Sequence, residues 1–383
     1  MIDRRRFLTR AGLASGLLVS PRLALASAPT DRRLVFIILR GAMDGLATVM
    51  PVGDPAHAAL RGNFGSPPQA GAPVALGPMF ALHPALSETA ALYARGEALF
   101  VHAIASPYRE RSHFDAQNVL ETGGTAAYAL KDGWLNRLLP LLPAAREPAV
   151  ALSPTLPMAL RGAAPAISYA PSQLPDADAD LLTRVTAMYA DDSQLHALWG
   201  QAIDARTMAG ADAQGRSNPA TLGKLAATFL ARPDGARVAV IEINGWDTHA
   251  AQTGRLNIQL RQLDAVIAAL HTGLGAEWRR TAIVAATEFG RTAAPNGTGG
   301  TDHGTGGVAL LAGGAVNGGR VIADWPGLAP GQLHEGRDLR PTADLRALFA
   351  GLAADHFGLD PVLVARTVFG SDPIRPLSGL LRA

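Results

Sequence analysis

The sequence predicts an α/β protein: one mostly parallel β-sheet between layers of helices. Two observations support this expectation: apolar segments of strand length recur along the 383 residues, and helical segments lie between them. The apolar segments are nearly continuous and contain β-branched residues, which is typical of strands buried on both faces of a parallel sheet. With 48% hydrophobic residues, the chain can build a single large core.

Polar or glycine-rich loops directly follow several of the expected strands. Ligands of open α/β sheets bind beyond the carboxyl ends of the strands, so these loops are expected to converge at one edge. The expected strands are residues 34–39, 98–104, 149–152, 238–243, 282–286 and 307–312.

Helices are expected between and after these strands, and the last of them has a start signal in Pro341, Thr342 and Asp344. Residues 155–235 show little strand character, which predicts a helical cap or insertion. Residues 29–383 are nevertheless expected to form a single domain. The expected helices span residues 193–209, 221–231, 256–274 and 342–357.

Residues 1–28 are expected to be an export signal peptide. A basic segment precedes a short apolar segment, residues 11–19, and small residues offer a cleavage site after it. The order Arg4-Arg5-x-Phe7-Leu8 resembles the twin-arginine signal, which a translocase reads to export folded proteins. The apolar segment is far shorter than the roughly 20 residues of a membrane-spanning helix. A periplasmic or secreted protein without a stable membrane span is therefore expected. The alternative for residues 1–28 is an ordinary amphipathic helix that is not an export signal.

Composition limits the chemistry that the chain can perform. It has no cysteine, which excludes disulfides, thiolate nucleophiles and cysteine-held metals. Any metal must be held by imidazole, carboxylate, hydroxyl or carbonyl groups. The formal charge is +2, and residues 1–28 carry five Arg and one Asp, or +4, which leaves −2 for the remainder. This balance gives no reason to expect a nucleic-acid partner.

Two loops carry the first candidate site residues. Asp44 lies between glycines in Arg40-Gly41-Ala42-Met43-Asp44-Gly45, which suits either a metal ligand or a residue that caps the next helix. The loop after residues 98–104 carries Arg111, Ser112 and His113. Arginine and imidazole suit a phosphate-like anion. Ser112 is either a helix cap or a nucleophile at a helix N-terminus.

Two further loops carry carboxylates and imidazoles. Asp247 and His249 are two residues apart, so in an extended segment both side chains point to one side, as a divalent-metal site requires. A surface pair is the alternative. In TEFGRTAAPNGTGGTDHGTGG, residues 287–307, the glycines are expected to bring an Asp-His pair back toward a glutamate. The candidates in this segment are Glu288, Arg291, Asp302 and His303.

Taken together, these motifs resemble domain-of-unknown-function family 1501, a family of exported bacterial proteins related to the alkaline phosphatase and sulfatase superfamily. The resemblance spans nearly the whole chain and implies an alkaline-phosphatase-like three-layer α/β sandwich. The segments that carry it are the twin-arginine motif, RGAMDGL, SHFDAQ, GWDTHAAQ, TEFGRT…NGTGGTDHGTGG and DLRPTADLRALF.

The resemblance implies a metal-dependent hydrolase that acts on a phosphate or sulfate ester of a small molecule or glycan. Ser112 would attack, and Arg111 or Arg291 would steady the anion. The metal would be Zn, Mn, Mg or Ca, in one or two ions. Asp44, Asp302 and His303 would hold one ion, and Asp247 with His249 would hold the second.

The chain also departs from the superfamily pattern. Only Thr248 separates Asp247 from His249, where three residues are usual. In the superfamily a further histidine completes the metal centre that Asp247 and His249 would form. His334 is the candidate for this ligand, and His113 or Glu288 could take its place. The sequence is therefore also compatible with a site for a single ion, or with no metal site. Two other functions stay open: a non-catalytic exported binding or assembly protein that retains the fold, with or without a structural metal, and a redox protein with an iron or manganese site.

Overall fold

The computed structural model describes residues 31–62, 64–65, 71–142, 149–171, 179–192, 195–200, 202–203, 218–370 and 374–382. The expected signal peptide, residues 1–28, lies outside the described residues, as do parts of the expected helix 193–209. In the described part of the chain, no helix is both long enough and apolar enough to cross a membrane.

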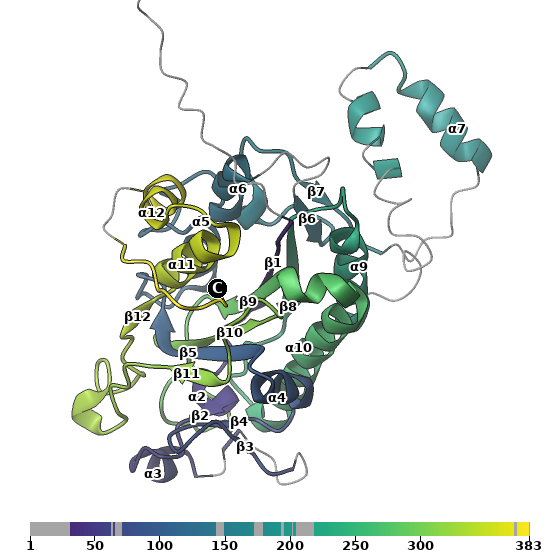
Figure 1. Cartoon of the computed structure of the whole chain (residues 1–383). Coiled ribbons are helices and arrows are strands. Elements are labelled where there is room, and N and C mark those ends of the chain that lie inside the picture. The colour runs from purple at the N-terminus through teal and green to yellow at the C-terminus, as the bar shows by residue number, and fades with distance from the viewer. Residues whose placement is uncertain are drawn as a thin grey trace, which may run out of the picture.

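A nine-stranded sheet forms the centre of the protein (Figure 1), in the order β11-β5-β10-β9-β1-β8-β6-β7 with β12 beside β5. All six expected strands are present. They are β1 (Arg33–Arg40), β5 (Ala98–Ala105), β6 (Ala149–Leu152), β8 (Val238–Asn244), β9 (Thr281–Thr287) and β10 (Gly307–Ala312). Three were not expected, because two or three residues are too few for an apolar pattern: β7 (Ile167–Ser168), β11 (Arg320–Ile322) and β12 (Ala343–Asp344).

Among the described residues, six of the eight strand pairings in this sheet are parallel, as predicted. The exception is β10, which runs antiparallel to both β9 and β5. The loop after β10, residues 313–319, therefore lies at the opposite edge and does not join the other strand-end loops. Residues 288–306 instead begin and end at the carboxyl edge of the sheet, because β9 ends there and β10 starts there.

Alternating residues of β1 show the three layers. Val35, Ile37 and Leu39 pack in one core with α4 (Ser87–Ala94), α9 (Pro219–Ala231) and α10 (Gln252–Leu274). Leu34, Phe36 and Ile38 pack in a second core on the other face. That core includes residues of α5 (His113–Thr122), α6 (Trp134–Leu138), α11 (Leu345–Phe357) and α12 (Pro361–Phe369). The prediction of an α/β sandwich with a mostly parallel sheet is confirmed.

The remaining elements are short and lie around this sandwich. A three-stranded sheet contains β2 (Val49–Met50), β4 (Ala81–Leu82) and β3 (Val74–Ala75), near α2 (Gly45–Thr48) and α3 (His57–Arg61). Helix α7 (Ala179–Met188) stands apart from the sandwich in Figure 1. The 3₁₀ helices are η2 (Leu139–Leu141), η3 (Met158–Leu160), η5 (Gly275–Arg280) and η6 (Pro330–Gln332).

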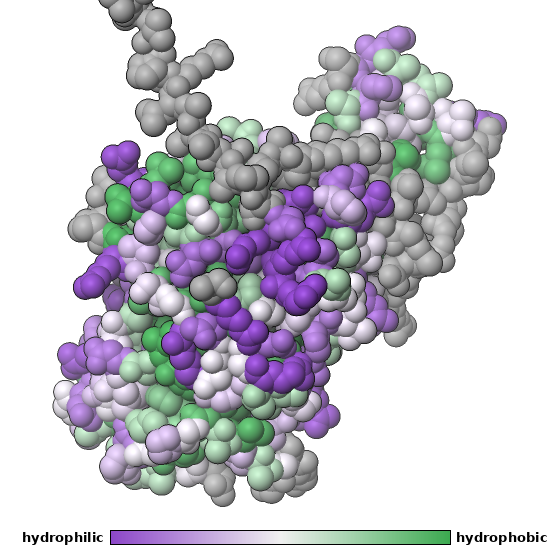
Figure 2. Space-filling model, viewed as in Figure 1, coloured by the Kyte–Doolittle hydropathy of each residue, from purple (hydrophilic) through white to green (hydrophobic). Residues whose placement is uncertain are grey.

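Two helix expectations are adjusted by the structure. Helix α11 begins at Leu345 rather than at residue 342, because Ala343 and Asp344 pair with β5 and the Asp344 side chain then caps the helix. Within residues 155–235, α9 belongs to a layer that covers the sheet; the expectation of a cap or insertion in this region stays a prediction. The outer surface is mixed: Figure 2 shows a band of hydrophilic residues across the middle of this face, with hydrophobic residues around it.

Two fully buried histidines predict acid sensitivity of the fold. His102 and His356 are 0% exposed, and their Nε2 atoms bond the carbonyls of Val49 (2.9 Å) and Arg33 (2.7 Å). Burial lowers the pKa of His102 to about 4 and that of His356 to about 3. In the unfolded chain both have a pKa of about 6.5. Below that pH the unfolded state binds protons that the folded state excludes, so stability falls as pH falls from about 6.5 toward these folded values.

Each of these two histidines should change the unfolding equilibrium by up to roughly tenfold per pH unit. Urea unfolding between pH 8 and pH 5, with a chelator present, measures this slope. A His102→Gln variant should show a shallower slope than the unmodified protein. Equal slopes would show that His102 is not a source of the acid sensitivity.

Candidate metal centre

Four side chains meet at the carboxyl edge of the sheet, and they come from three separate loops. His113 is the first residue of α5, just after the loop that follows β5. Asp247 and His249 follow β8, and His303 lies in the loop between β9 and β10. The parallel order of β5, β1 and β8 and the reversal at β10 place all three loops at this edge.

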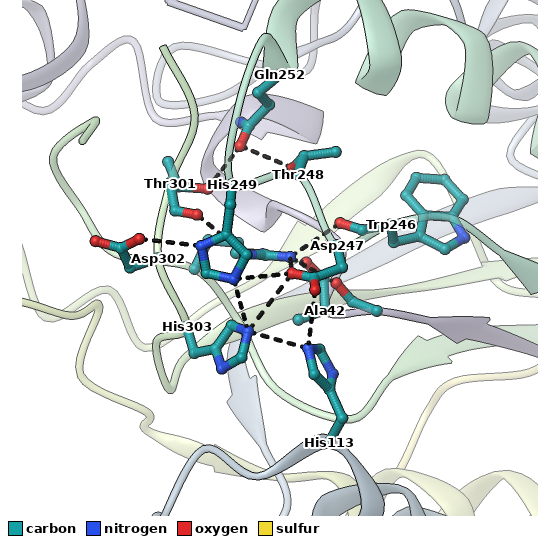
Figure 3. Close-up of polar contacts among 12 residues, drawn as sticks. Ala42, His113, Trp246, Asp247, Thr248, His249, Gln252, Thr301, Asp302 and His303 are labelled. Carbon is teal, nitrogen blue, oxygen red and sulfur yellow. Dashed lines mark hydrogen bonds and ion pairs between the residues drawn. The ribbon is translucent and has the colours of Figure 1, made fainter. Parts of the chain in front are cut away.

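These side chains make one compact group (Figure 3). Metal-binding atoms of His113, Asp247 and His303 all lie within 4.8 Å of one another. The Nε2 atom of His303 is 3.0 Å from Nε2 of His113 and 2.9 Å from Nε2 of His249. The Asp247 carboxylate is 3.1 Å from His249 Nε2 and 3.5 Å from the Nε2 atoms of His113 and His303.

The other ring nitrogen of each histidine faces an acceptor. His113 Nδ1 is 2.8 Å from Glu288 Oε1, His249 Nδ1 is 3.0 Å from Asp302 Oδ1, and His303 Nδ1 is 3.0 Å from the Arg111 carbonyl. Carboxylate and carbonyl oxygens only accept hydrogen bonds, so these partners assign the N–H proton to Nδ1 in each ring. In the neutral rings the three Nε2 lone pairs are then directed at one another.

Three converging lone pairs and a carboxylate repel one another unless a cation lies between them. A ring N–H bonded to a carboxylate or carbonyl, with the opposite nitrogen free, is the usual setting of a metal-binding histidine. Burial lowers the pKa of His303, and the nearby His113 and Arg291 add to this, which keeps its Nε2 lone pair available. The group therefore fits a divalent ion. Imidazole-rich sets favour zinc or iron over magnesium, calcium and manganese.

Arg291 lies beneath this group rather than beside a substrate. Its guanidinium is 0% exposed and donates to the carbonyls of Gly41 (2.8 Å), Ala42 (2.8 Å), Trp246 (3.2 Å) and Thr301 (3.0 Å) as well as to Asp247. Burial acts to raise the pKa of Asp247, but the hydrogen bond and charge of Arg291 outweigh it and hold that pKa below its usual value. The contact of Arg291 with a substrate anion stays a prediction; in the structure these five acceptors bond its guanidinium.

Arg111 is also engaged. Its guanidinium bonds Asp338 (2.7 and 3.0 Å) and Glu335 (2.5 Å), while its carbonyl accepts the His303 Nδ1–H. Arg111 has a φ of 61°, a left-handed conformation that is unusual for a non-glycine residue. Its role in anion binding stays a prediction; in this structure its side chain is paired with two carboxylates and its carbonyl bonds His303.

Glu288 and Asp302 contact the histidines from behind. Glu288 is fully buried and accepts from His113 Nδ1, the Gly41 N–H (2.8 Å) and Gln117 Nε2 (3.1 Å). Burial acts to raise the pKa of Glu288, but these hydrogen bonds lower it overall. Hydrogen bonds from Asn296 and His249 lower the pKa of Asp302. Both residues were expected to bind metal directly, and this stays a prediction; in the structure each accepts the Nδ1–H of an imidazole.

Asp44 is separate from this group. Its side chain caps α2 by accepting from the Leu46 and Ala47 N–H groups, and it also accepts from Arg61 (2.6 Å) and Gln252 (2.5 Å). Asp44 and Arg61 are both buried, with side chains 1% and 0% exposed. The expected grouping of Asp44 with Asp302 and His303 therefore differs from the structure, in which Arg61 supplies the positive charge next to Asp44.

Ser112 occupies the N-cap position of α5, but its hydroxyl makes no capping hydrogen bond. The residue is half-buried and directly precedes His113. The sequence left open whether Ser112 caps the helix or acts as a nucleophile, and the structure shows no capping hydrogen bond from its side chain. The hydroxyl remains a candidate nucleophile.

The glycine-rich segment is a tightly folded loop. Backbone bonds join Gly304 N–H to Gly290 (2.8 Å), Thr292 N–H to Asp302 (3.0 Å) and Gly290 N–H to Thr305 (2.9 Å). A Cβ at Gly304 would overlap the backbone of Arg291, whereas one at Gly297 would meet nothing within 4 Å. The glycines therefore allow backbone to pack against backbone, and this brings His303 beside Arg291. The sequence predicted that Asp302 and His303 return toward Glu288; in the structure His303 reaches Glu288 through His113, which contacts both.

Sequence analysis missed two buried residues that support the centre, Arg61 and Gln252. Arg61 is the last residue of the short helix α3, in a segment with no recognisable motif. Gln252 was visible at the end of GWDTHAAQ, and a glutamine so close to two candidate ligands was a usable signal. His334, a candidate third ligand, lies outside the metal-binding group found among the described residues, and its Nε2 is 3.8 Å from Glu335.

Fold and site together define a three-layer α/β protein with a candidate His/Asp metal centre. The chain belongs to the family described as "Protein of unknown function (DUF1501)", whose model matches residues 31–368. Comparison with curated proteins gives no match.

Several solved structures are similar to this chain. One is the sulfatase PsFucS1 from Pseudoalteromonas sp., at 12% identity over 97% of this chain and 75% of that chain, with a TM-score of 0.41. Another is the C-terminal periplasmic domain of EcEptC from Escherichia coli, at 12% identity over 88% and 86%, with a TM-score of 0.40. A third is the alkaline phosphatase of the Antarctic bacterium TAB5, at 13% identity over 73% and 90%, with a TM-score of 0.38.

Proposed function

We propose that this protein is a metal-dependent hydrolase of a phosphate or sulfate ester, with one divalent ion held by His113, Asp247, His249 and His303. The observation that carries the proposal is the convergence of three Nε2 atoms and a carboxylate in one group. Asp247 and His249 are each 45% exposed, so solvent and a substrate can reach it. An open position of this kind distinguishes catalytic from structural metal sites.

We propose one ion rather than two because of the carboxylate charges around the site. The buried Glu288 carboxylate accepts hydrogen bonds from His113, Gln117, Thr287 and a backbone N–H, and an ion on His113 would balance its charge. Asp44, which was expected to hold one of two ions together with Asp302 and His303, is already paired with Arg61. The bound ion would supply a Lewis acid at the ester group.

Ser112 is the proposed nucleophile. Its hydroxyl is not used as a helix cap, and its position at the N-terminus of α5 favours negative charge on the oxygen. The Ser112 oxygen would bond to phosphorus or sulfur as the bond to the alcohol breaks. The proton lost by Ser112 balances the proton gained by the departing alcohol. Water would then release the acid and restore Ser112.

The proposed cellular setting follows from residues 1–28, which predict export by the twin-arginine translocase. The protein would act in the periplasm or outside the cell. Its substrate would be a small-molecule or glycan ester.

The test combines metal analysis with an ester screen. The purified chain is stripped of metal, reloaded in turn with Zn²⁺, Mn²⁺, Fe²⁺, Mg²⁺ and Ca²⁺, and assayed with nitrophenyl phosphate and sulfate esters. We expect one ion per chain and turnover of at least one ester, with turnover lost and the ion retained in Ser112→Ala. A bound ion without turnover would support the non-catalytic binding protein. Absence of any bound ion would overturn the proposal. Turnover by the Ser112→Ala variant would show that Ser112 is not the nucleophile, and would leave the proposal of a metal-dependent hydrolase in place.

A further inference from the structure

A buried glutamine behind the metal group joins the two loops that carry its ligands. Gln252, the first residue of α10, is 0% exposed. Its Oε1 atom accepts from the hydroxyl of Thr248 at 2.9 Å and from the hydroxyl of Thr301 at 2.6 Å (Figure 3). The two threonines are 1% and 0% exposed, so water does not compete for these bonds.

Both threonines are next to metal-site residues in the chain. Thr248 lies between Asp247 and His249, and Thr301 directly precedes Asp302. A side-chain oxygen that accepts from both hydroxyls therefore fixes the distance between the two loops. We call Thr248, Gln252 and Thr301 the Thr–Gln–Thr bridge.

The orientation of the Gln252 amide is set from its other end. Its Nε2 donates to Asp44 Oδ2 at 2.5 Å, and a carboxylate can only accept, so Oε1 must face the threonines. Asp44 is held in turn by Arg61, which also donates to the carbonyls of Ala293 (2.7 Å) and Thr292 (2.6 Å). This network anchors the bridge to the glycine-rich loop.

We propose that Gln252 is a positioning residue that holds His249 and His303 at metal-binding distance through Thr248 and Thr301. The proposal rests on the metal centre proposed above. The two imidazoles have Nε2 atoms 2.9 Å apart, and each belongs to a different loop. Loss of an outer-shell partner costs metal sites roughly 10- to 100-fold in affinity, and that range is expected here.

The test compares hydroxyl-deleting and hydroxyl-keeping variants. Thr301→Val and Thr248→Val remove the bond to Gln252 at nearly constant volume, whereas Thr301→Ser and Thr248→Ser retain it. Thr281→Val is the matched control: Thr281 is also 0% exposed, and its hydroxyl donates to the Glu277 carbonyl at 2.8 Å in a region outside the metal group. Zn²⁺ affinity, the visible spectrum of the Co²⁺-loaded protein and stability of the metal-free protein are measured for each.

We expect each valine variant to lose roughly 10- to 100-fold in Zn²⁺ affinity with an altered Co²⁺ spectrum, and each serine variant to retain both. Thr281→Val should lose stability but keep wild-type affinity. In a Gln252→Ala background, Thr301→Val should cause no further loss. Wild-type affinity in the Thr301→Val variant, or equal affinity loss in Thr281→Val, would overturn the proposal. Failure of the unmodified chain to bind any ion would instead overturn the metal centre itself.

Discussion

Replacing His303 by alanine should reduce Zn²⁺ affinity by more than about a hundredfold, beyond the cost of losing an outer-shell partner. His303 has the largest expected effect because its Nε2 is within 3.0 Å of the corresponding atoms of both His113 and His249. Its removal deletes one proposed ligand and the contact that links the other two histidines. Competition with a chromogenic chelator measures the affinity of the unmodified chain and the variant.

His334→Ala is the matched control for this prediction. The sequence left His334 open as the third histidine ligand, but in the structure its Nε2 lies 3.8 Å from Glu335 and outside the metal group. The affinity of this variant should equal that of the unmodified chain. Equal losses in the two variants would show that His334, and not His303 alone, belongs to the centre.

Arg291→Ala should lower the free energy of unfolding by about 1–3 kcal/mol or more, because buried backbone carbonyls would be left without a donor. The guanidinium is 0% exposed, and its loss leaves the Asp247 carboxylate without its cation. It also leaves the carbonyls of Gly41, Ala42 and Thr301 without their donor. Urea unfolding of the metal-free chain measures the effect without a contribution from the bound ion.

Arg95→Ala controls for the loss of an arginine as such. Arg95 is 45% exposed and pairs with Glu97 at 3.3 Å, so its removal should cost no more than about 1 kcal/mol. If Arg291→Ala were no more costly than Arg95→Ala, Arg291 would not be the residue that joins the loops beneath the centre.

The sequence was informative where local pattern determines structure. Continuous apolar segments located all six long strands, and the polar loops after them located His113, Asp247, His249 and His303 at one edge. The path of residues 288–306 was harder to predict, because a loop of that length can either cross to the other edge of the sheet or return to the same edge. Only the pairing of β10 with β9 and β5 shows that it turns back.

The roles within the site could not be assigned from residue type. Glu288 and Asp302 are as suitable for metal as Asp247, and only the direction of each imidazole shows that they bond Nδ1 atoms instead. Asp44 is the clearest example. Its partner Arg61 is 17 residues away on a short helix with no motif, so no pattern indicated that a guanidinium would lie next to this carboxylate.

The wide spacing of the ligands decides when an ion can be acquired. His113 and His303 are 190 residues apart, so an unfolded chain has no assembled site, and tight binding requires the finished sheet. Proteins select metals in cells largely by which ion is available when the site forms. If residues 4–8 direct export after folding, as their sequence predicts, the centre would already exist in the cytoplasm. The metal supply of the compartment where the protein folds, rather than that of the compartment where it works, would then determine which ion it carries.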